Sequence, residues 1–198
     1  MRPIEPNIIN NLFEALDRQI EVHGGMPLGL VVCGGTALSA LGLVMRTTRD
    51  VDILGAVLET PHRLTIQRMT EFPEWLVEAA NKVGRDFDLP ENWFNLGPAS
   101  QVVLGLPGGL EKRLVRKVYG RYLTIFFISR IDQIHFKLYA AVDQDGYHVQ
   151  DLFALKPKEA EIEKAAQWTV TQDVSEVFKT LLKDFLEIHH YGDIAKRI

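Results

Sequence analysis

The stretch from residue 31 to residue 54, "VVCGGTALSALGLVMRTTRDVDIL", constrains the fold more than any other part of this 198-residue chain. It starts with a short apolar run that ends at a glycine pair, Gly34 and Gly35, and it closes on two aspartates separated by one valine. Short apolar runs bounded by turn-forming residues are typical of buried strands. We therefore predict a strand, a tight glycine turn, a short helix of small residues and a second strand, in that order.

The two aspartates are the first candidate functional residues. Side chains alternate across a strand, so Asp50 and Asp52 are expected on one face with their Cα atoms about 7 Å apart. Two carboxylates that close repel each other unless a cation lies between them. Mg²⁺ takes one or two carboxylates and completes its shell with water and phosphate oxygens. The pair therefore fits a Mg²⁺–nucleotide site, although a solvated edge strand can carry the same pattern.

The glycine pair gives the aspartates a context. Gly34 and Gly35 allow the backbone to turn sharply and to approach a ligand closely. Thr36 follows at the start of the predicted helix, where unpaired backbone N–H groups favour a phosphate. The spacing matches neither the dinucleotide-binding fingerprint nor the P-loop. A plain strand-to-helix turn is the alternative interpretation.

The rest of the chain changes character near residue 129. Before it, the pattern predicts a helix within residues 4–25, a helix starting at Thr60 and Pro61, another from Pro73 to about Lys82, and two strands around Gly120. After it, helical patterns dominate, and the last long helix is expected to bury Val174, Val177, Phe178, Leu181, Leu182 and Phe185. We predict an α+β lobe over residues 1–128, with a mixed sheet flanked by helices, and a helical lobe over residues 129–198 packed on it.

Composition limits the class of protein. The net charge of −4 argues against a protein that coats bulk nucleic acid. No apolar run approaches the ~20 residues that span a bilayer, and the start of the chain does not resemble a signal peptide. The single cysteine, Cys33, excludes an internal disulfide. These features predict a cytoplasmic protein without a membrane partner.

Together, the strand, Gly-Gly turn, short helix and D-x-D strand resemble the nucleotidyltransferase superfamily. In addition, "MRTTRDVDIL" resembles the R-x-T-x-D-hydrophobic-D form of its stand-alone bacterial, AbiEii-like branch, through Arg46, Thr48, Asp50 and Asp52. Two later segments, "LPENWFN" and "FKLYAAVDQDGYHVQDLFAL", are similar to further elements of that branch. The likeness covers roughly residues 30–156.

The resemblance implies a function and a set of site residues. It implies Mg²⁺-dependent transfer of a nucleotide from a nucleoside triphosphate to a hydroxyl of RNA or a protein, by a toxin with an antitoxin partner. Asp50 and Asp52 would be catalytic and would bind the metal. The nucleotide-binding residues would be Gly34, Gly35, Thr36, Arg46, Thr48, Lys137 and Asp151.

The chain also departs from the superfamily pattern. A third carboxylate normally lies on a later strand, but the corresponding stretch "YLTIFFIS" contains no acidic residue. Asp86, Asp88 and Glu111 are the other candidates for this third acid, although none lies on the expected strand. An alternative is therefore a catalytically degenerate member that binds nucleotide or a protein partner without turnover.

Two basic features of the sequence also allow more than one interpretation. Lys137 is expected either at a phosphate or at the rim of a helical face, with its head in solvent. The stretch "EKRLVRKVYGRY" fits a face for nucleic acid or a protein substrate. It also fits a charged hairpin edge that prevents aggregation.

Overall fold

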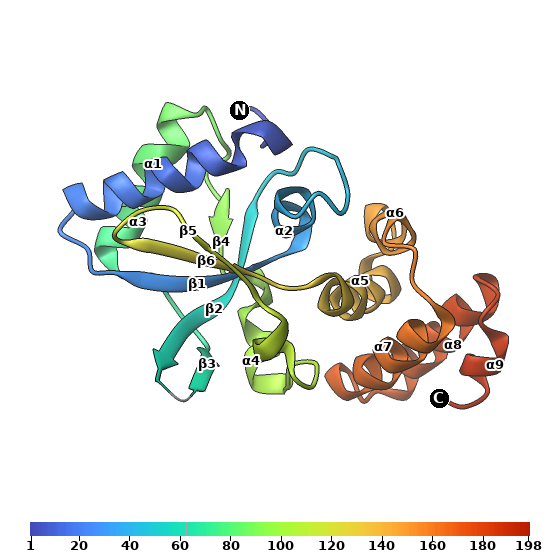
Figure 1. The fold of residues 1–198 in the computed structure, drawn as a ribbon. Helices are drawn as coiled ribbons and strands as arrows, with labels where there is room; N and C mark the ends of the chain where they lie inside the picture. Colours follow the sequence, from blue (N-terminus) through green and yellow to red (C-terminus); the bar gives the residue numbers. More distant parts are fainter. Residues whose placement is uncertain (62) are drawn as a thin grey trace. The chain divides into compact units, whose positions relative to one another are not determined.

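The computed structural model of this chain describes residues 1–61 and 63–198. The chain divides into two compact units, Met1–Ser129 (unit 1) and Arg130–Ile198 (unit 2). Within the described residues, unit 1 contains strands and helices, whereas unit 2 contains helices only (Figure 1). The chain therefore has the α+β class that the sequence predicts.

The sheet of unit 1 is mixed. Its strands are β1 (Leu28–Cys33), β2 (Val51–Thr60), β3 (Arg63–Gln67), β4 (Phe94–Asn95), β5 (Val115–Val118) and β6 (Leu123–Phe127). Their order is β3-β2-β1-β6-β5, and β4 pairs with β2 beside this path. The β1–β6 and β2–β4 pairs are parallel, and the other pairs are antiparallel. Strand β1 is therefore central, which explains why "LGLVVC" is a continuous apolar run.

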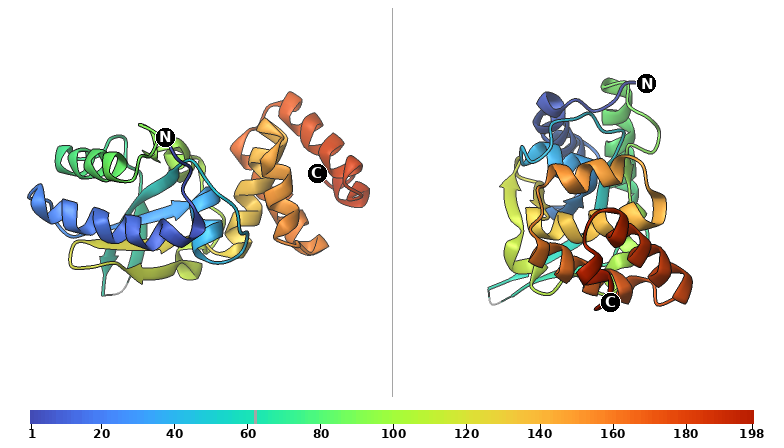
Figure 2. Two further views of the ribbon diagram at one scale, coloured as in Figure 1. Left: turned by 90° about the horizontal axis from the view of Figure 1, so that it is seen from above. Right: turned by 90° about the vertical axis from the view of Figure 1, so that its right-hand side faces the viewer.

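Two long helices cover one face of this sheet. Unit 1 contains α1 (Ile9–Val22), α2 (Gly34–Ala40), α3 (Glu74–Asp86) and α4 (Gln101–Leu104), with 3-10 turns at Pro6–Ile8, Gly97–Ser100 and Leu110–Arg113. Helices α1 and α3 lie side by side over the sheet (Figure 2). The core between them and the strands includes Leu12, Leu16, Ile20, Leu76, Val83, Leu30, Val32, Ile53 and Ile125. This layer fixes the positions of the strand ends that form the site.

One acid interrupts the apolar face of α1. The Oδ1 atom of Asp17 accepts hydrogen bonds from the backbone N–H groups of Tyr122 at 2.8 Å and Leu123 at 2.7 Å. Asp17 is only 8% exposed, and its carboxylate lies where a side chain on Gly120 would have to stand. The buried acid therefore joins α1 to the turn between β5 and β6.

Unit 2 is a helical unit built around its first helix. It contains α5 (Arg130–Gln144), α6 (Tyr147–Ala154), α7 (Glu159–Gln172), α8 (Glu176–Ile188) and α9 (Gly192–Ala195). Helix α5 contacts α6, α7 and α8. Arg130 donates to the Glu161 carboxylate at 2.8 and 3.1 Å and to the backbone oxygen atoms of Leu155 and Lys156. The start of α5 is thus tied to the connection between α6 and α7.

Two local predictions are wrong. No helix starts at Thr60, because β2 extends to that residue and Arg63–Gln67 pair with it as β3. The Thr60 hydroxyl accepts the N–H of Arg63 at 3.1 Å and closes this hairpin. On α8, Phe178 and Leu182 are buried as expected, but Val177 and Leu181 are exposed, as is Val174 before the helix. The helix has apolar residues on more than one face, so periodicity alone did not identify the buried one.

Among the described residues, no helix combines the length and the apolar character needed to cross a membrane.

Candidate functional site

The glycine turn and the aspartates meet where β1 ends and β2 begins. Cys33, the last residue of β1, is the register partner of Asp52 in the antiparallel β1–β2 ladder. Helix α2 starts at the next residue, Gly34. Asp50 directly precedes β2, and Asp52 is its second residue. The strand register therefore brings the two halves of the sequence motif together.

Neither glycine has room for a side chain. Gly34 has a φ angle of +66°, and the Oδ2 atom of Asp52 fills the place that a Cβ would take. A Cβ on Gly35 would lie 2.7 Å from the Thr48 hydroxyl and 3.1 Å from Nη2 of Arg46. From the sequence, the glycines are expected to let a ligand approach the backbone. The structure shows a second reason for them, because side chains of the site itself occupy the space that a Cβ atom would need.

Two threonines hold Asp50. The Thr36 hydroxyl donates to the backbone oxygen of Asp50 at 2.6 Å, and the Thr48 hydroxyl lies 3.2 Å from Oδ1 of the same residue. Both threonines are buried. The Thr36 hydroxyl thus joins α2 to the segment before β2. The expected part of Thr36 and Thr48 in nucleotide binding stays a prediction.

The loop between α2 and β2 is fixed at several points. Thr48 forms an antiparallel bridge with Ile4, with N–O distances of 2.7 and 3.0 Å. The Ser39 hydroxyl donates to the backbone oxygen of Arg46 at 2.9 Å. Arg46 is half-buried, and its guanidinium lies beside Gly35. The R-x-T-x-D-V-D segment is therefore held against the glycine turn by hydrogen bonds to α2 and to the start of the chain.

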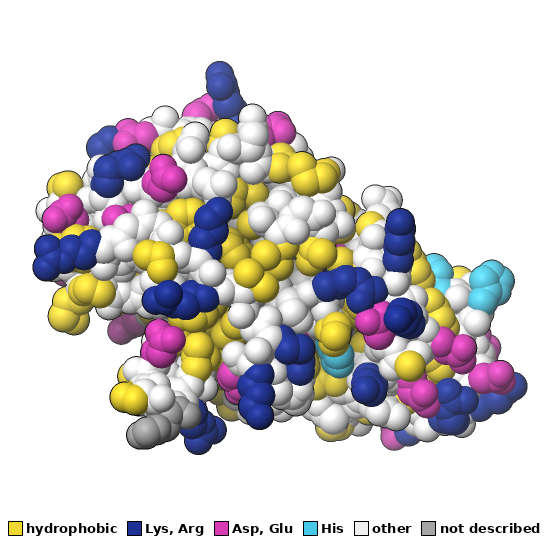
Figure 3. Space-filling view, viewed as in Figure 1, with side chains coloured by type: hydrophobic (Ala, Val, Ile, Leu, Met, Phe, Trp, Pro, Cys, Tyr) yellow, Lys and Arg dark blue, Asp and Glu magenta, His cyan; other side chains and the backbone are white. Residues whose placement is uncertain are grey.

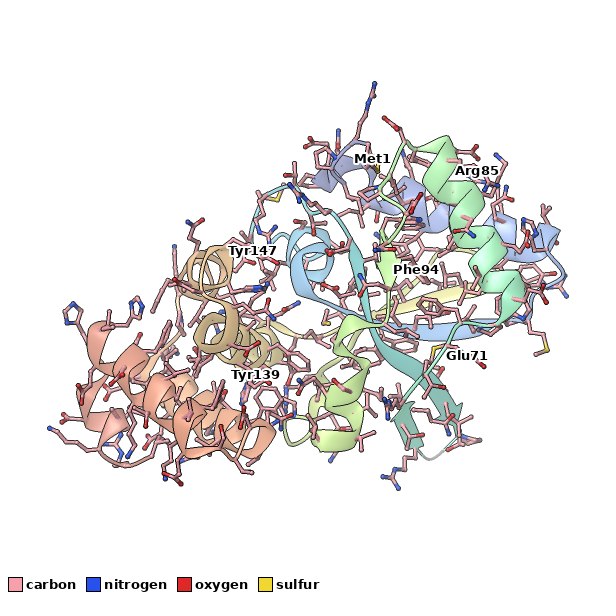
Figure 4. The ribbon with its side chains drawn as sticks, turned by 180° about the vertical axis from the view of Figure 1, so that it is seen from behind. Met1, Glu71, Arg85, Phe94, Tyr139 and Tyr147 are labelled. Atoms are coloured by element: carbon pink, nitrogen blue, oxygen red, sulfur yellow. The ribbon has the colours of Figure 1, made fainter. Side chains whose placement is uncertain are left out.

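Asn95 is a site residue that the sequence prediction missed. Its Nδ2 atom donates to Oδ1 of Asp52 at 3.3 Å, and the two residues are register partners in the parallel β2–β4 pair. The preceding Trp93 is 2% exposed and donates its indole N–H to the backbone oxygen of Ala80 at 3.0 Å. Phe94, labelled in Figure 4, also packs into the core. The motif "LPENWFN" contained the signal, since its aromatic pair anchors the strand that presents the asparagine.

The residues present fit a hard divalent cation. Asp50 and Asp52 are half-buried carboxylates beside a backbone turn, and both are oxygen donors. Among residues 1–61 and 63–198, no group of three or more His, Cys, Asp or Glu side chains could hold a metal ion. A site with two carboxylates suits Mg²⁺, which completes its shell with water and phosphate oxygens.

The strand on which a third acid was expected does not adjoin Asp52. Strand β6, which contains most of "YLTIFFIS", pairs with β1 and β5, so β1 lies between it and β2. Two of the other candidate acids form ion pairs outside the site. Asp86 pairs with Lys82, and Asp88 pairs with the amino group of Met1. Strand β4 lies beside Asp52 on the side away from β1, and it presents the neutral amide of Asn95 there.

Lys137 and Asp151 form a buried ion pair in unit 2. The Nζ and Oδ2 atoms are 2.8 Å apart, and the side chains are 4% and 2% exposed. The Lys137 ammonium also lies 5.7 Å from the centre of the Tyr147 ring. The pair joins α5 to α6, so the alternative that places the lysine head in solvent is wrong. The part of both residues in nucleotide binding stays a prediction.

The basic stretch 111–122 forms an edge of the sheet. Arg116 lies 6.0 Å above the Phe126 ring and Arg121 lies 5.6 Å above that of Tyr122, while Lys117 donates to Asn10 at 2.7 Å. On the face shown in Figure 3, basic side chains are interspersed with acidic and apolar ones. The position on edge strand β5 favours the protective interpretation.

A glycine turn facing paired aspartates, on a mixed sheet flanked by helices, defines a nucleotidyltransferase-type domain. Residues 10–162 match the family described as "Nucleotidyltransferase of unknown function (DUF6036)", and the chain belongs to this family. The match includes every site residue named above. Comparisons with curated proteins and with solved structures give no significant match.

Proposed function

We propose that this protein is a Mg²⁺-dependent nucleotidyltransferase, which transfers a nucleotide from a nucleoside triphosphate to a hydroxyl group of RNA or a protein. The observation that carries the proposal is the register of Cys33 with Asp52, because it sets the glycine turn directly against Asp52. Membership of the nucleotidyltransferase family supports the reaction class.

The proposal assigns roles to the charged and polar residues around the glycine turn. Asp50 and Asp52 hold the cation, and Thr48 orients Asp50 by its hydrogen bond. The Arg46 guanidinium, beside Gly35, supplies positive charge for the triphosphate. Bound Mg²⁺ supplies charge neutralisation at the phosphates and orients them for in-line displacement. Lys137 and Asp151 are included as nucleotide-binding residues by resemblance alone.

A second candidate is a nucleotide-binding member of the family that does not turn over. The observation that favours it is Asn95, a neutral side chain on the strand beside Asp52. Positioning a second metal normally requires a third carboxylate, and loss of a general base lowers a rate by roughly 10²–10⁴-fold. Such a protein would bind the Mg²⁺–triphosphate and react slowly or not at all.

Binding of labelled ATP, CTP, GTP and UTP, with and without Mg²⁺, tests both candidates against a protein with no nucleotide site. We expect Mg²⁺-dependent binding of at least one nucleotide, and its loss in the double variant Asp50→Ala with Asp52→Ala. The matched control is Asp86→Ala with Asp88→Ala, which removes two acids of unit 1 outside the site and should bind normally. Absence of Mg²⁺-dependent binding to all four nucleotides would overturn the proposal.

Transfer of label to total cellular RNA or protein then separates the two candidates. Covalent label that depends on Asp50 and Asp52 supports the enzyme, and binding without label supports the degenerate member.

The toxin role, the antitoxin partner and the AbiEii-like branch are proposed from resemblance alone. Expression in a bacterial host tests the toxin role: arrested growth with the wild-type chain, but not with the double aspartate variant, is expected.

A further inference from the structure

Asn95 approaches Asp52 from β4, a strand outside the β1–α2–β2 sequence motif. Strand β4 contains only Phe94 and Asn95, and it pairs in parallel with the two residues at the start of β2. The pairing sets Asn95 opposite Asp52 and Phe94 opposite Val51. Because side chains alternate across a strand, Phe94 enters the core and Asn95 faces the site.

Hydrogen bonds fix the orientation of the Asn95 amide. The backbone N–H of Gly97 donates to Oδ1 of Asn95 at 2.8 Å. The amide oxygen is thus the acceptor, which leaves the Nδ2 group to donate to Oδ1 of Asp52 at 3.3 Å. An ionised aspartate at position 95 could not make this contact, because a carboxylate without a proton cannot donate a hydrogen bond.

The strand itself is held firmly. The backbone N–H of Val51 donates to the oxygen of Trp93 at 2.5 Å, and the Trp93 indole is buried. Phe94 packs against Phe72, with ring centres 4.9 Å apart. Asn95 is therefore presented by a rigid element, as a side chain that orients another group must be.

The two oxygen atoms of Asp52 face different elements. Oδ1 receives the Asn95 amide from β4, and Oδ2 lies against Gly34 at the start of α2. The carboxylate plane is therefore set by contacts on both sides. Partners that orient a metal-binding carboxylate in this way typically change metal affinity by 10–100-fold when removed.

We propose that Asn95 is a positioning residue, which orients the Asp52 carboxylate toward a divalent cation and keeps the position beside it neutral. The inference rests on the proposed function, because it assigns the cation to Asp50 and Asp52. Removal of the amide should weaken cation binding. Replacement by a carboxylate should strengthen it, because affinity for hard cations rises with the charge of the ligand set.

Titration of the full chain with Mn²⁺, followed by electron paramagnetic resonance of the free ion, tests the inference without any need for catalysis. We expect Asn95→Ala to weaken Mn²⁺ binding about tenfold and Asn95→Asp to bind Mn²⁺ more tightly than the wild type. The matched control is Asn10→Ala, which removes an exposed asparagine that bonds Lys117 and Tyr119, far along the sequence from the aspartates. It should bind Mn²⁺ as the wild type does.

The outcomes distinguish this inference from the proposed function. Wild-type chain that binds no Mn²⁺ would overturn the metal site and the role of Asn95 together. If the wild type binds Mn²⁺ but Asn95→Ala binds it equally well, only the role of Asn95 is overturned. Urea unfolding of each variant shows whether it folds. If Asn95→Ala does not, Asn95→Leu decides in its place, because it keeps a side chain of similar size without the amide that bonds Asp52. Mn²⁺ binding by this variant as tight as that of the wild type overturns the inference.

Discussion

At the level of single residues, the site depends on two glycines that have no side chain. Gly34 and Gly35 leave room for Asp52 and for the pair Thr48 and Arg46. The chain contains a useful comparison in Gly42, which has a φ angle of +65° but nothing within 4 Å of a built Cβ. Gly34 and Gly42 therefore both have a positive φ angle, but only at Gly34 would a Cβ atom meet another side chain.

Substitution of Gly34 and Gly42 by alanine separates the cost of the backbone conformation from the cost of the contact with Asp52. Gly42→Ala should lower the free energy of unfolding by roughly 1–2 kcal/mol, which is the cost of a left-handed backbone for a residue with a Cβ. Gly34→Ala should cost about 1–3 kcal/mol more, because Asp52 must also move. Urea unfolding measures both values, and nucleotide binding should fall only in Gly34→Ala. Equal costs at the two positions would show that the contact with Asp52 is unimportant.

At the scale of elements, buried charges join segments that lie far apart in the sequence. Asp17 joins α1 to the start of β6, and Lys137 with Asp151 joins α5 to α6. In each case the charged group replaces an apolar contact that the helical pattern alone would suggest. Their effect on stability depends on whether a buried polar partner is left unsatisfied when they are removed.

The role of Asp17 is testable with two substitutions. Asp17→Ala leaves the N–H groups of Tyr122 and Leu123 without their acceptor, at a cost of about 2–4 kcal/mol. Asp17→Asn should cost clearly less, because both bonds end on Oδ1 and an amide oxygen can accept them. Chemical unfolding compares the two variants. A cost for asparagine as large as that for alanine would mean that the negative charge, rather than the acceptor, matters.

The ion pair in unit 2 needs a double-mutant test. Asp151→Ala should cost roughly 3–5 kcal/mol, since it leaves the Lys137 ammonium buried without its carboxylate. The double change Lys137→Met with Asp151→Leu should cost much less. Nucleotide binding by this double variant then decides the function of the pair. Retained binding indicates a structural pair, and lost binding in a stable chain supports the nucleotide-binding residues implied by resemblance.

At the scale of the whole molecule, the stability of the chain should depend on pH through Glu161. Its hydrogen bond with Arg130 lowers the pKa of Glu161 below the ordinary value. A lowered pKa means that the carboxylate stabilises the fold above the ordinary range of glutamate, and that this stabilisation is lost as the pH falls through the lowered value.

Glu161→Gln should therefore lower the free energy of unfolding at pH 7 by about 1 kcal/mol, a value reduced for partial exposure. The difference from the wild type should shrink as the solution is made acidic. Glu163→Gln is the matched control on the same helix, because Glu163 pairs with Arg197 at a more exposed position. It should change stability by less than about 0.5 kcal/mol. A Glu161→Gln difference that does not depend on pH would contradict the assignment.

The sequence predicted the parts of the site that are local. Strand β1, the glycine turn, the short helix and the strand after Asp50 all follow from patterns within a few residues. The hairpin of β2 and β3 escaped, because Pro61 after Thr60 also suits the start of a helix. Asn95 escaped as a site residue because a two-residue strand has too short a pattern to predict its pairing.

A face shared by the paired acids stays a prediction, but the α+β class and the order of the main elements follow from the sequence alone. These properties depend on hydrophobic periodicity and turn residues, which act over short distances along the chain. The tertiary structure decided which distant groups meet: Gly34 with Asp52, Asp52 with Asn95, and Asp17 with the start of β6. Such contacts depend on strand register and on helix packing, and no local pattern in the sequence encodes them.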